Sequence, residues 1–184
     1  MRAPTNTPRP RVAASIAVLL VFMAGCHSKT AATPQNFIAT LNAHFADHPE
    51  CLLPDAPRFP YETSDPQKTR QMDALVASKL LDVAREATLH VSRYIPTEMG
   101  NRLAPRFCFG HRAVTTIDNF TPPAPANGFT ETQVTYHYTM QDVAVWAKSQ
   151  QMQTAFPALA KALSGDSTDT TTLAGAMTGW QVPD

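Results

Sequence analysis

The sequence lacks the short motifs that mark many catalytic and cofactor sites. It has no Cys-x-x-Cys pair, no His-Glu-x-x-His, no Gly-x-Ser-x-Gly, and neither the Gly-x-Gly-x-x-Gly fingerprint nor a phosphate-binding loop. No pair of carboxylates stands at a recognisable catalytic spacing. The sequence therefore predicts no cofactor and names no catalytic residue, which favours a non-enzymatic protein over an enzyme.

Glycine is scarce and proline abundant, with 7 glycines against 16 prolines in 184 residues. This balance favours short elements and stiff connections. Hydrophobic residues make up 43% of the chain, enough to bury a core. We expect one globular domain of the α+β class over residues 34–184, with a helical half at 34–104 and a sheet half at 105–184.

Acidic residues are missing from the first 25 positions, which carry Arg2, Arg9 and Arg11. Taking these three from the 15 basic residues leaves 12 against 15 acidic residues, so the remaining chain has a net charge of −3. An acidic chain offers no electrostatic footprint for a phosphate backbone. We therefore expect no nucleic-acid partner.

The apolar run Val12–Met23 is too short to cross a membrane. It has 12 residues, whereas a transmembrane helix needs roughly 20. A basic start, a short apolar middle and small residues after it predict a signal peptide over residues 1–25. Because Pro10 separates Arg9 from Arg11, the twin-arginine signal is absent and Sec export is expected.

The end of this segment, Met23-Ala24-Gly25-Cys26, resembles the lipobox of bacterial lipoproteins. The resemblance implies cleavage before Cys26 and acylation of that cysteine, so the membrane is expected as a partner through a lipid anchor. It also implies an outer-membrane location facing the periplasm, because His27 stands where aspartate is the inner-membrane retention signal. Residues 27–33 are small and polar, so residues 26–33 are expected to be the lipidated cysteine and a flexible tether.

Two cysteines remain, Cys51 and Cys108. An oxidising compartment favours a disulfide between them. The bond would close a loop of roughly 58 residues and stabilise the fold by about 4 kcal/mol. The alternative is a pair of buried free thiols.

Local patterns predict mostly helix in the first half of the mature chain. Thr33 and Pro34 begin a helix over 34–46, and Ser64-Asp65-Pro66 begins a second one. The proline-rich stretch 48–60 is expected to be extended, with a short strand at 51–53. Two short strands, 83–87 and 90–95, and a helix from 96 complete this half.

Residues 67–103 resemble the second half of a winged-helix domain. The similar segments are Met72–Leu81, in place of a helix that ends in Gly-Leu-Leu, and Arg93–Gly100, in place of Tyr-x-Leu-Thr-x-x-Gly. Lys79 stands where the family has glycine, and Pro96 shifts the threonine. The resemblance implies a similar shape but no DNA binding, because the mature chain is acidic.

The second half is rich in β-forming residues. Residues 107–120 and 130–140 are predicted strands, and in the second one Val134, Tyr136, Tyr138 and Met140 alternate with polar residues. The stretch 122–128 is expected to be a loop, and Asp142 to cap a helix that breaks at Phe156-Pro157. A closing hairpin over 170–182 gives β-β-α-β-β, an antiparallel sheet with a helix on one face.

Three groups of side chains are candidate binding residues. His111, Arg112 and His137 would line one side of the sheet and receive an anionic ligand, or be ordinary exposed side chains. His44 and His48 have metal-ligand spacing, or are solvated residues at a helix end, and no metal is expected. A third group would offer a stacking surface or belong to the core, and consists of Tyr94, Trp146 and Trp180.

Three functions remain open. The first is a non-enzymatic accessory lipoprotein that binds another protein of the cell envelope. The second is a periplasmic hydrolase acting on cell-wall material or a small ester. The third is a carrier of a small ligand in an apolar pocket.

Overall fold

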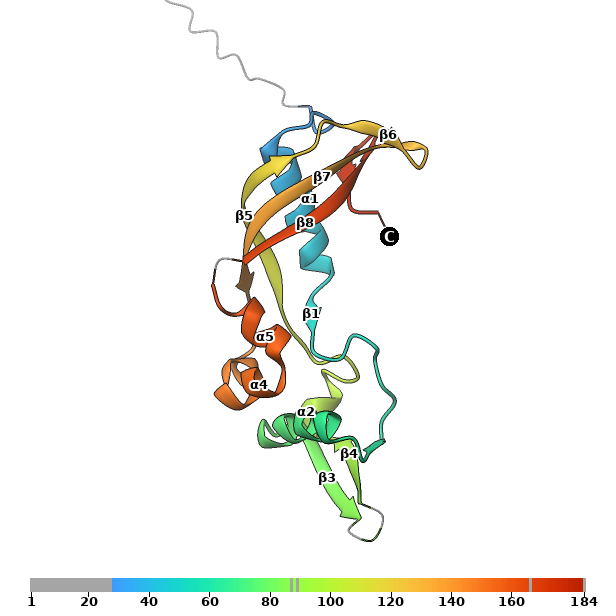
Figure 1. Ribbon diagram of the computed structural model, residues 1–184, viewed down its shortest axis with the longest axis vertical. Helices are drawn as coiled ribbons and strands as arrows, with labels where there is room; N and C mark the ends of the chain where they lie inside the picture. Colours follow the sequence, from blue (N-terminus) through green and yellow to red (C-terminus); the bar gives the residue numbers. More distant parts are fainter. Residues whose placement is uncertain (1–27, 87, 89, 166, 184) are drawn as a thin grey trace, which may run out of the picture.

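The structure is a computed structural model and describes residues 28–86, 88, 90–165 and 167–183. These residues form an elongated molecule in which two hydrophobic cores follow one another along the long axis (Figure 1). Helices and antiparallel sheets are both present, so the predicted α+β class is confirmed. The predicted signal peptide at 1–25 and the lipobox with Cys26 lie outside the described residues.

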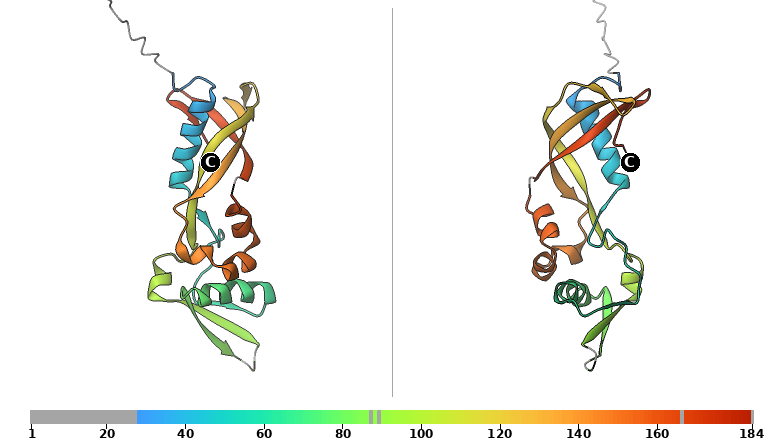
Figure 2. Two further views of the ribbon diagram at one scale, coloured as in Figure 1. Left: turned by 90° about the vertical axis from the view of Figure 1, so that its left-hand side faces the viewer. Right: turned by 45° about the vertical axis from the view of Figure 1, so that its right-hand side comes forward.

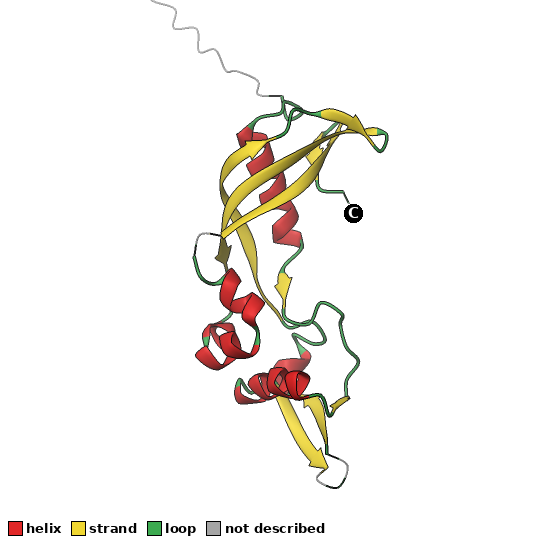
Figure 3. Cartoon of the chain, in the orientation of Figure 1, coloured by secondary structure: helices red, strands yellow, loops and turns green. Residues whose placement is uncertain are grey.

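Within the described residues, six strands form one curled antiparallel sheet (Figure 3). Its order is β1-β5-β7-β8-β9, and β6 pairs with β7. The strands are β1 (Glu50–Cys51), β5 (Cys108–Phe120), β6 (Ala124–Ala126), β7 (Phe129–Gln141), β8 (Ser167–Ala176) and β9 (Gly179–Gln181). The two long predicted strands and the closing hairpin are therefore confirmed.

The alternation predicted for β7 decides which face of the sheet is buried. Val134, Tyr136 and Tyr138 are buried, and each is followed by a more exposed residue. Alternate residues of a strand point to opposite faces. These three side chains belong to one of the two hydrophobic cores, which we call the first core. One face of β7 is therefore buried in this core, as predicted.

Helix α1 (Pro34–Asp47) covers this face (Figure 2). It buries Phe37, Leu41 and Phe45 against the sheet, and the Thr33 side chain caps its first turn. Asn42 also accepts a hydrogen bond of 2.7 Å from the backbone N–H of Val114, beside a bulge in β5. We expected the covering helix to come from the second half of the chain, and this expectation is wrong.

The second core lies in the other half of the molecule. It is built from α2 (Pro66–Ala77), α3 (Glu98–Asn101), a 3-10 turn η1 (Val145–Lys148), α4 (Gln150–Ala155), α5 (Pro157–Ala162) and a small sheet. That sheet has the order β2-β4-β3, with β2 (Tyr61–Thr63), β3 (Leu81–Glu86) and β4 (Val91–Pro96). Each core thus draws on both halves of the sequence.

Two features of this half follow from backbone conformation. Lys79 ends α2 with φ of 58°, at the position where the winged-helix pattern has glycine. Gly100 in α3 lies so close to β3 that an added Cβ would sit 1.8 Å from the carbonyl oxygen of Leu80. Only glycine therefore fits there without a backbone shift.

The structure corrects two local predictions in the second half. Residues 122–128 are not entirely loop, because β6 pairs Pro125 with Thr130 at the sheet edge, where proline is tolerated. Asp142 does not cap a helix, since it has φ of 52° in the turn that leaves β7. The cap is Ser149, whose hydroxyl accepts from the Met152 N–H, and the break at Phe156-Pro157 is as predicted.

Residues 28–33, which we expected to be a flexible tether, are hydrogen-bonded to the folded part. The Asn36 amide donates to the carbonyl oxygens of Ser28 and Ala31, at 2.9 and 2.8 Å. The indole N–H of Trp180 also donates to Ala31, at 3.2 Å. In the part of the chain that the structure describes, no helix has the length and apolar composition needed to cross a bilayer.

Candidate functional site

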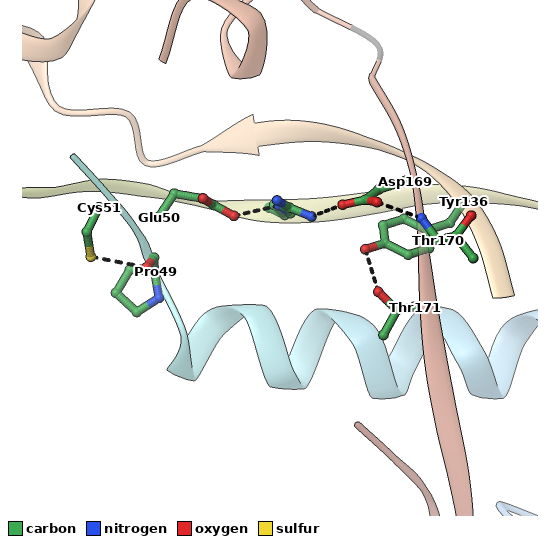
Figure 4. A network of polar contacts seen from close by, with 8 residues as sticks. Pro49, Glu50, Cys51, Tyr136, Asp169, Thr170 and Thr171 are labelled. Atoms are coloured by element: carbon green, nitrogen blue, oxygen red, sulfur yellow. Dashed lines mark hydrogen bonds and ion pairs between the residues drawn. The ribbon is translucent and has the colours of Figure 1, made fainter. Parts of the chain in front are cut away.

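Arg112 is the centre of the most extensive ionic network in the sheet. It lies on β5 and contacts Glu50 of β1 and Asp169 of β8. Figure 4 labels these two carboxylates. Its Nε lies 2.6 Å from Glu50 Oε1, and its Nη1 lies 2.5 Å from Asp169 Oδ2. One guanidinium on β5 therefore joins the edge strand β1 to β8, which is three positions away from β1 in the sheet.

Two aromatic rings complete the surroundings of this guanidinium. Its Cζ lies 4.7 Å from the ring centroid of Tyr138 and 5.4 Å from that of Phe45. The Arg112 side chain is only 22% exposed. Burial alone would lower its pKa, but the charge of Glu50 and the hydrogen bond to Asp169 outweigh it, so the pKa of Arg112 is raised. The cation is thus permanent and fully paired.

Neighbouring polar groups hold Asp169 and the adjoining ring in place. The backbone N–H of Thr170 donates to Asp169 Oδ1 at 2.7 Å. The Tyr136 hydroxyl lies 3.0 Å from the Thr171 hydroxyl, as Figure 4 shows. Burial is the main cause that raises the pKa of Tyr136. The phenol therefore stays neutral beside a network in which one cation contacts two carboxylates.

The predicted disulfide between Cys51 and Cys108 is present, next to this network. It links β1 to β5, where Cys51 and Cys108 are direct partners in the register. Glu50 precedes Cys51, so the bond also fixes the carboxylate that Arg112 contacts. The covalent and the ionic cross-link thus hold the same two-residue strand.

A cavity of about 390 Å³ opens beside Arg112, between the two cores. One wall is the network with Glu50, Asp169 and Tyr138, and the other is α5 with Phe156. Lys161 also faces it. Around the whole cavity two cationic side chains, Arg112 and Lys161, face two anionic ones, Glu50 and Asp169, so the cavity has no net attraction for an anion.

Three groups of the cavity wall that could take part in catalysis are already engaged in other contacts. Cys51 is oxidised, and both carboxylates are paired with Arg112. A general base needs a proton-accepting group that can reach a substrate. The cavity can therefore receive a neutral small molecule or an apolar side chain, and no observation favours the hydrolase alternative.

The structure does not bring His111, Arg112 and His137 together. Arg112 contacts Phe45 of α1, so it lies on the covered face of the sheet. His111 precedes it, and His137 precedes the core residue Tyr138, so both histidines lie on the opposite face. There His137 Nε2 lies 3.0 Å from Asp118, and His111 Nδ1 lies 3.6 Å from Asp142. The predicted anion site is replaced by intramolecular pairs.

No local pattern in the sequence pointed directly to Glu50 and Asp169, which are 62 and 57 positions away from Arg112. One indirect signal existed. A disulfide between Cys51 and Cys108 in an antiparallel pair places Glu50 near residues 110–112. No comparable signal pointed to Asp169.

His44 and His48 lie together at the end of α1. Their rings stack with centroids 4.1 Å apart, and His48 Nδ1 lies 2.8 Å from the carbonyl oxygen of His44. Among residues 28–183, apart from the undescribed positions, no cluster of three or more His, Cys, Asp and Glu side chains is arranged to hold a metal ion.

The three aromatic candidates do not share a surface. Tyr94 is fully buried in the second core, and Trp146 packs against that core. Trp180 belongs to the first core, with its ring 5.2 Å from Phe37 in an edge-on contact. They are core aromatics, which was the alternative interpretation.

An apolar groove of about 600 Å³ lies in the half of the molecule away from Ser28. Its walls are mostly proline and hydrophobic residues, including Pro57, Phe59, Ile95 and Pro105. Ile95 is 44% exposed, and Met99 of the adjacent α3 is 52% exposed. Sequence reasoning missed this groove because its residues come from three separate loops and strand ends.

Comparisons with protein-family models, with curated proteins and with solved structures give no match for this chain. Its function is therefore inferred from its own residues and geometry.

Proposed function

We propose that this chain is an outer-membrane lipoprotein on the periplasmic side, anchored through acylated Cys26, and that it binds another envelope protein without catalysing a reaction. The lipobox Met23-Ala24-Gly25-Cys26 supports the anchor. The disulfide between Cys51 and Cys108 is consistent with an oxidising compartment. Fractionation of cells on a density gradient tests the location, with the protein expected in the outer-membrane fraction.

The observation that carries the binding role is the groove beside Ile95 and Met99. Exposed apolar side chains that cluster around a groove are typical of protein interaction sites. The groove lies away from Ser28, so a partner could reach it while the chain is anchored (Figure 1). The network of Arg112, by contrast, supports the fold, since its charged groups contact one another.

Site-specific photocrosslinking tests this binding role in living cells. A photoreactive residue replaces Met99 in the full chain, and the control replaces Asn119, an exposed residue of β5. We expect a discrete crosslinked species at position 99 that is absent at position 119. Ile95→Asp in the same chain should reduce it at least threefold. Equal crosslinking at both positions, or none at position 99, would count against the proposal.

A small-ligand carrier is a second candidate, favoured by the 390 Å³ cavity. Its volume falls in the range of small-molecule pockets, and its lining combines apolar side chains with four charged ones. Native mass spectrometry of protein isolated from cells is expected to show a retained small molecule under this alternative. A spectrum of the bare chain alone would remove it.

A further inference from the structure

We propose that the end of the molecule next to Ser28 lies directly on the phospholipid bilayer, with Phe129 and Met177 inserted at the interface. This inference rests on the proposed anchor at Cys26 and assigns the membrane-facing surface. The occupant of that surface is the lipid headgroup and upper acyl-chain region.

The first step is that the start of the described chain is held in place. Asn36 of α1 bonds the carbonyl oxygens of Ser28 and Ala31, and Trp180 of β9 bonds Ala31 again. The Ser28 hydroxyl also lies 2.6 Å from the Thr30 hydroxyl. Ser28 is therefore part of the folded domain rather than part of a flexible linker.

The second step is a distance limit. Only His27 lies between Cys26 and Ser28, and two residues of extended chain span at most about 7 Å. A diacylated or triacylated cysteine sits at the membrane interface because its chains are buried in the bilayer. Ser28 must then lie within about 7 Å of that interface, which brings the end of the molecule that carries Ser28 to the membrane.

The third step concerns the two turns that lie at the same end of the molecule as Ser28. The turn between β6 and β7 and the turn between β8 and β9 gather at this end of the long axis (Figures 1 and 2). Strand pairing brings them together, since Thr130 pairs with Gly175 and Ala176 with Gly179. Gly179 in turn contacts the backbone of Lys29, because an added Cβ would lie 3.3 Å from the Lys29 carbonyl oxygen.

These two turns carry two exposed large apolar side chains. Phe129 begins β7 and is 53% exposed, and Met177 follows β8 and is 98% exposed. Such side chains gain free energy when they enter the boundary between headgroups and acyl chains. Their position beside the proposed anchor explains why they are left uncovered by the protein.

The charges at this end are few and of both signs. Lys29 lies beside Gly179, and Glu131 lies beside Phe129 along the groove next to β9. A cluster of basic residues, which would indicate recognition of anionic lipid, is not found around these turns in the described part of the chain. The contact is therefore apolar, and it does not depend on lipid charge.

Depth-dependent fluorescence quenching tests the inference in the full, lipidated chain. Met177→Trp places a reporter at the proposed interface. Val145→Trp is the matched control, because Val145 is 86% exposed and lies in η1, in the other half of the molecule. Both proteins are reconstituted in vesicles of phosphatidylethanolamine and phosphatidylglycerol that contain a spin-labelled lipid, and the emission of the unsubstituted protein, from Trp146 and Trp180, is subtracted.

We expect the added emission at position 177 to be quenched at least twofold and shifted to shorter wavelength, and that at position 145 to be unchanged. The same quenching is expected when phosphatidylglycerol is replaced by phosphatidylcholine. Equal quenching at both positions, no quenching at position 177, or a requirement for anionic lipid would overturn the inference.

The intact mass of each reconstituted sample separates this inference from the proposed function. A mass without acyl chains overturns the anchor and the membrane-facing surface together. A mass that shows acylation, with no quenching at position 177, overturns only the surface and leaves the anchor standing.

Discussion

At the scale of single residues, Arg112 shows how distant partners decide what a charged side chain does. The sequence offered it, with His111 and His137, either as a receptor for an anionic ligand or as an ordinary exposed side chain, and the structure pairs it with Glu50 and Asp169. Both carboxylates come from distant segments, so no local pattern could reveal them. The guanidinium is a cross-link of the fold because its charge is already neutralised.

Replacing Arg112 by alanine should destabilise the chain by about 2–3 kcal/mol. The change leaves two partly buried carboxylates without their cation and removes packing on Tyr138. Arg106→Ala is the control, since Arg106 is exposed, and a surface change of this kind usually stays within about 0.5 kcal/mol. Chemical denaturation gives both values. Equal effects of the two substitutions would contradict the structural role of Arg112.

Tyr136 should make stability fall in alkaline solution. Burial raises its pKa above the ordinary value of 10.0, so the folded state keeps the phenolic proton when the unfolded state loses it. The contribution is complete below pH 10 and is lost as pH rises through the folded-state pKa. Denaturation between pH 9 and 11 should show a smaller loss in Tyr136→Phe than in the parent. A loss in Tyr136→Phe as large as that in the parent would contradict this role of the phenol.

At the scale of elements, the sequence predicted those whose signals are local. The cap Thr33-Pro34 fixed the start of α1, and the alternation in β7 identified its buried face. It could not predict that α1 covers the sheet, because apolar stripes do not specify their partner. It also misplaced the helix after β7, because Asp142 and Ser149 are both good capping residues and only the turn geometry distinguishes them.

Reduction of the disulfide should lower the unfolding free energy by about 4 kcal/mol, because the unfolded chain regains the entropy of a long open loop. Denaturation with and without a reductant measures the effect. In the double variant Cys51→Ser, Cys108→Ser the reductant should do nothing, and the stability should equal that of the reduced parent. An unchanged parent under full reduction would show that the cross-link adds no stability.

At the scale of the whole molecule, the two proposed contacts, with the membrane and with a partner, lie in different halves of the chain. Ser28 and two apolar turns lie at one end, and the groove beside Ile95 and Met99 lies in the other half. The cavity at Arg112 lies between them. The sequence could predict neither the groove nor the hydrogen bonds that hold residues 28–33 on the folded part. Both depend on contacts across the fold, such as that of Trp180 with Ala31.

Asn36→Ala should loosen the start of the described chain with little effect on the rest. It removes both amide bonds to Ser28 and Ala31, at a cost of about 1–2 kcal/mol. Hydrogen exchange should become faster over residues 28–33 and stay unchanged in β7. Gln35→Ala, on the exposed side of the same turn, should leave both regions as they are. Parental protection of residues 28–33 in Asn36→Ala would contradict the role of that amide.

The most direct test of the proposed anchor is the incorporation of radiolabelled palmitate into the protein in bacterial cells, with Cys26→Ser as the matched control. We predict a labelled, membrane-bound protein for the parent and an unlabelled one for Cys26→Ser. A parent chain that carries no label, or label that persists in Cys26→Ser, would contradict lipid attachment at this cysteine.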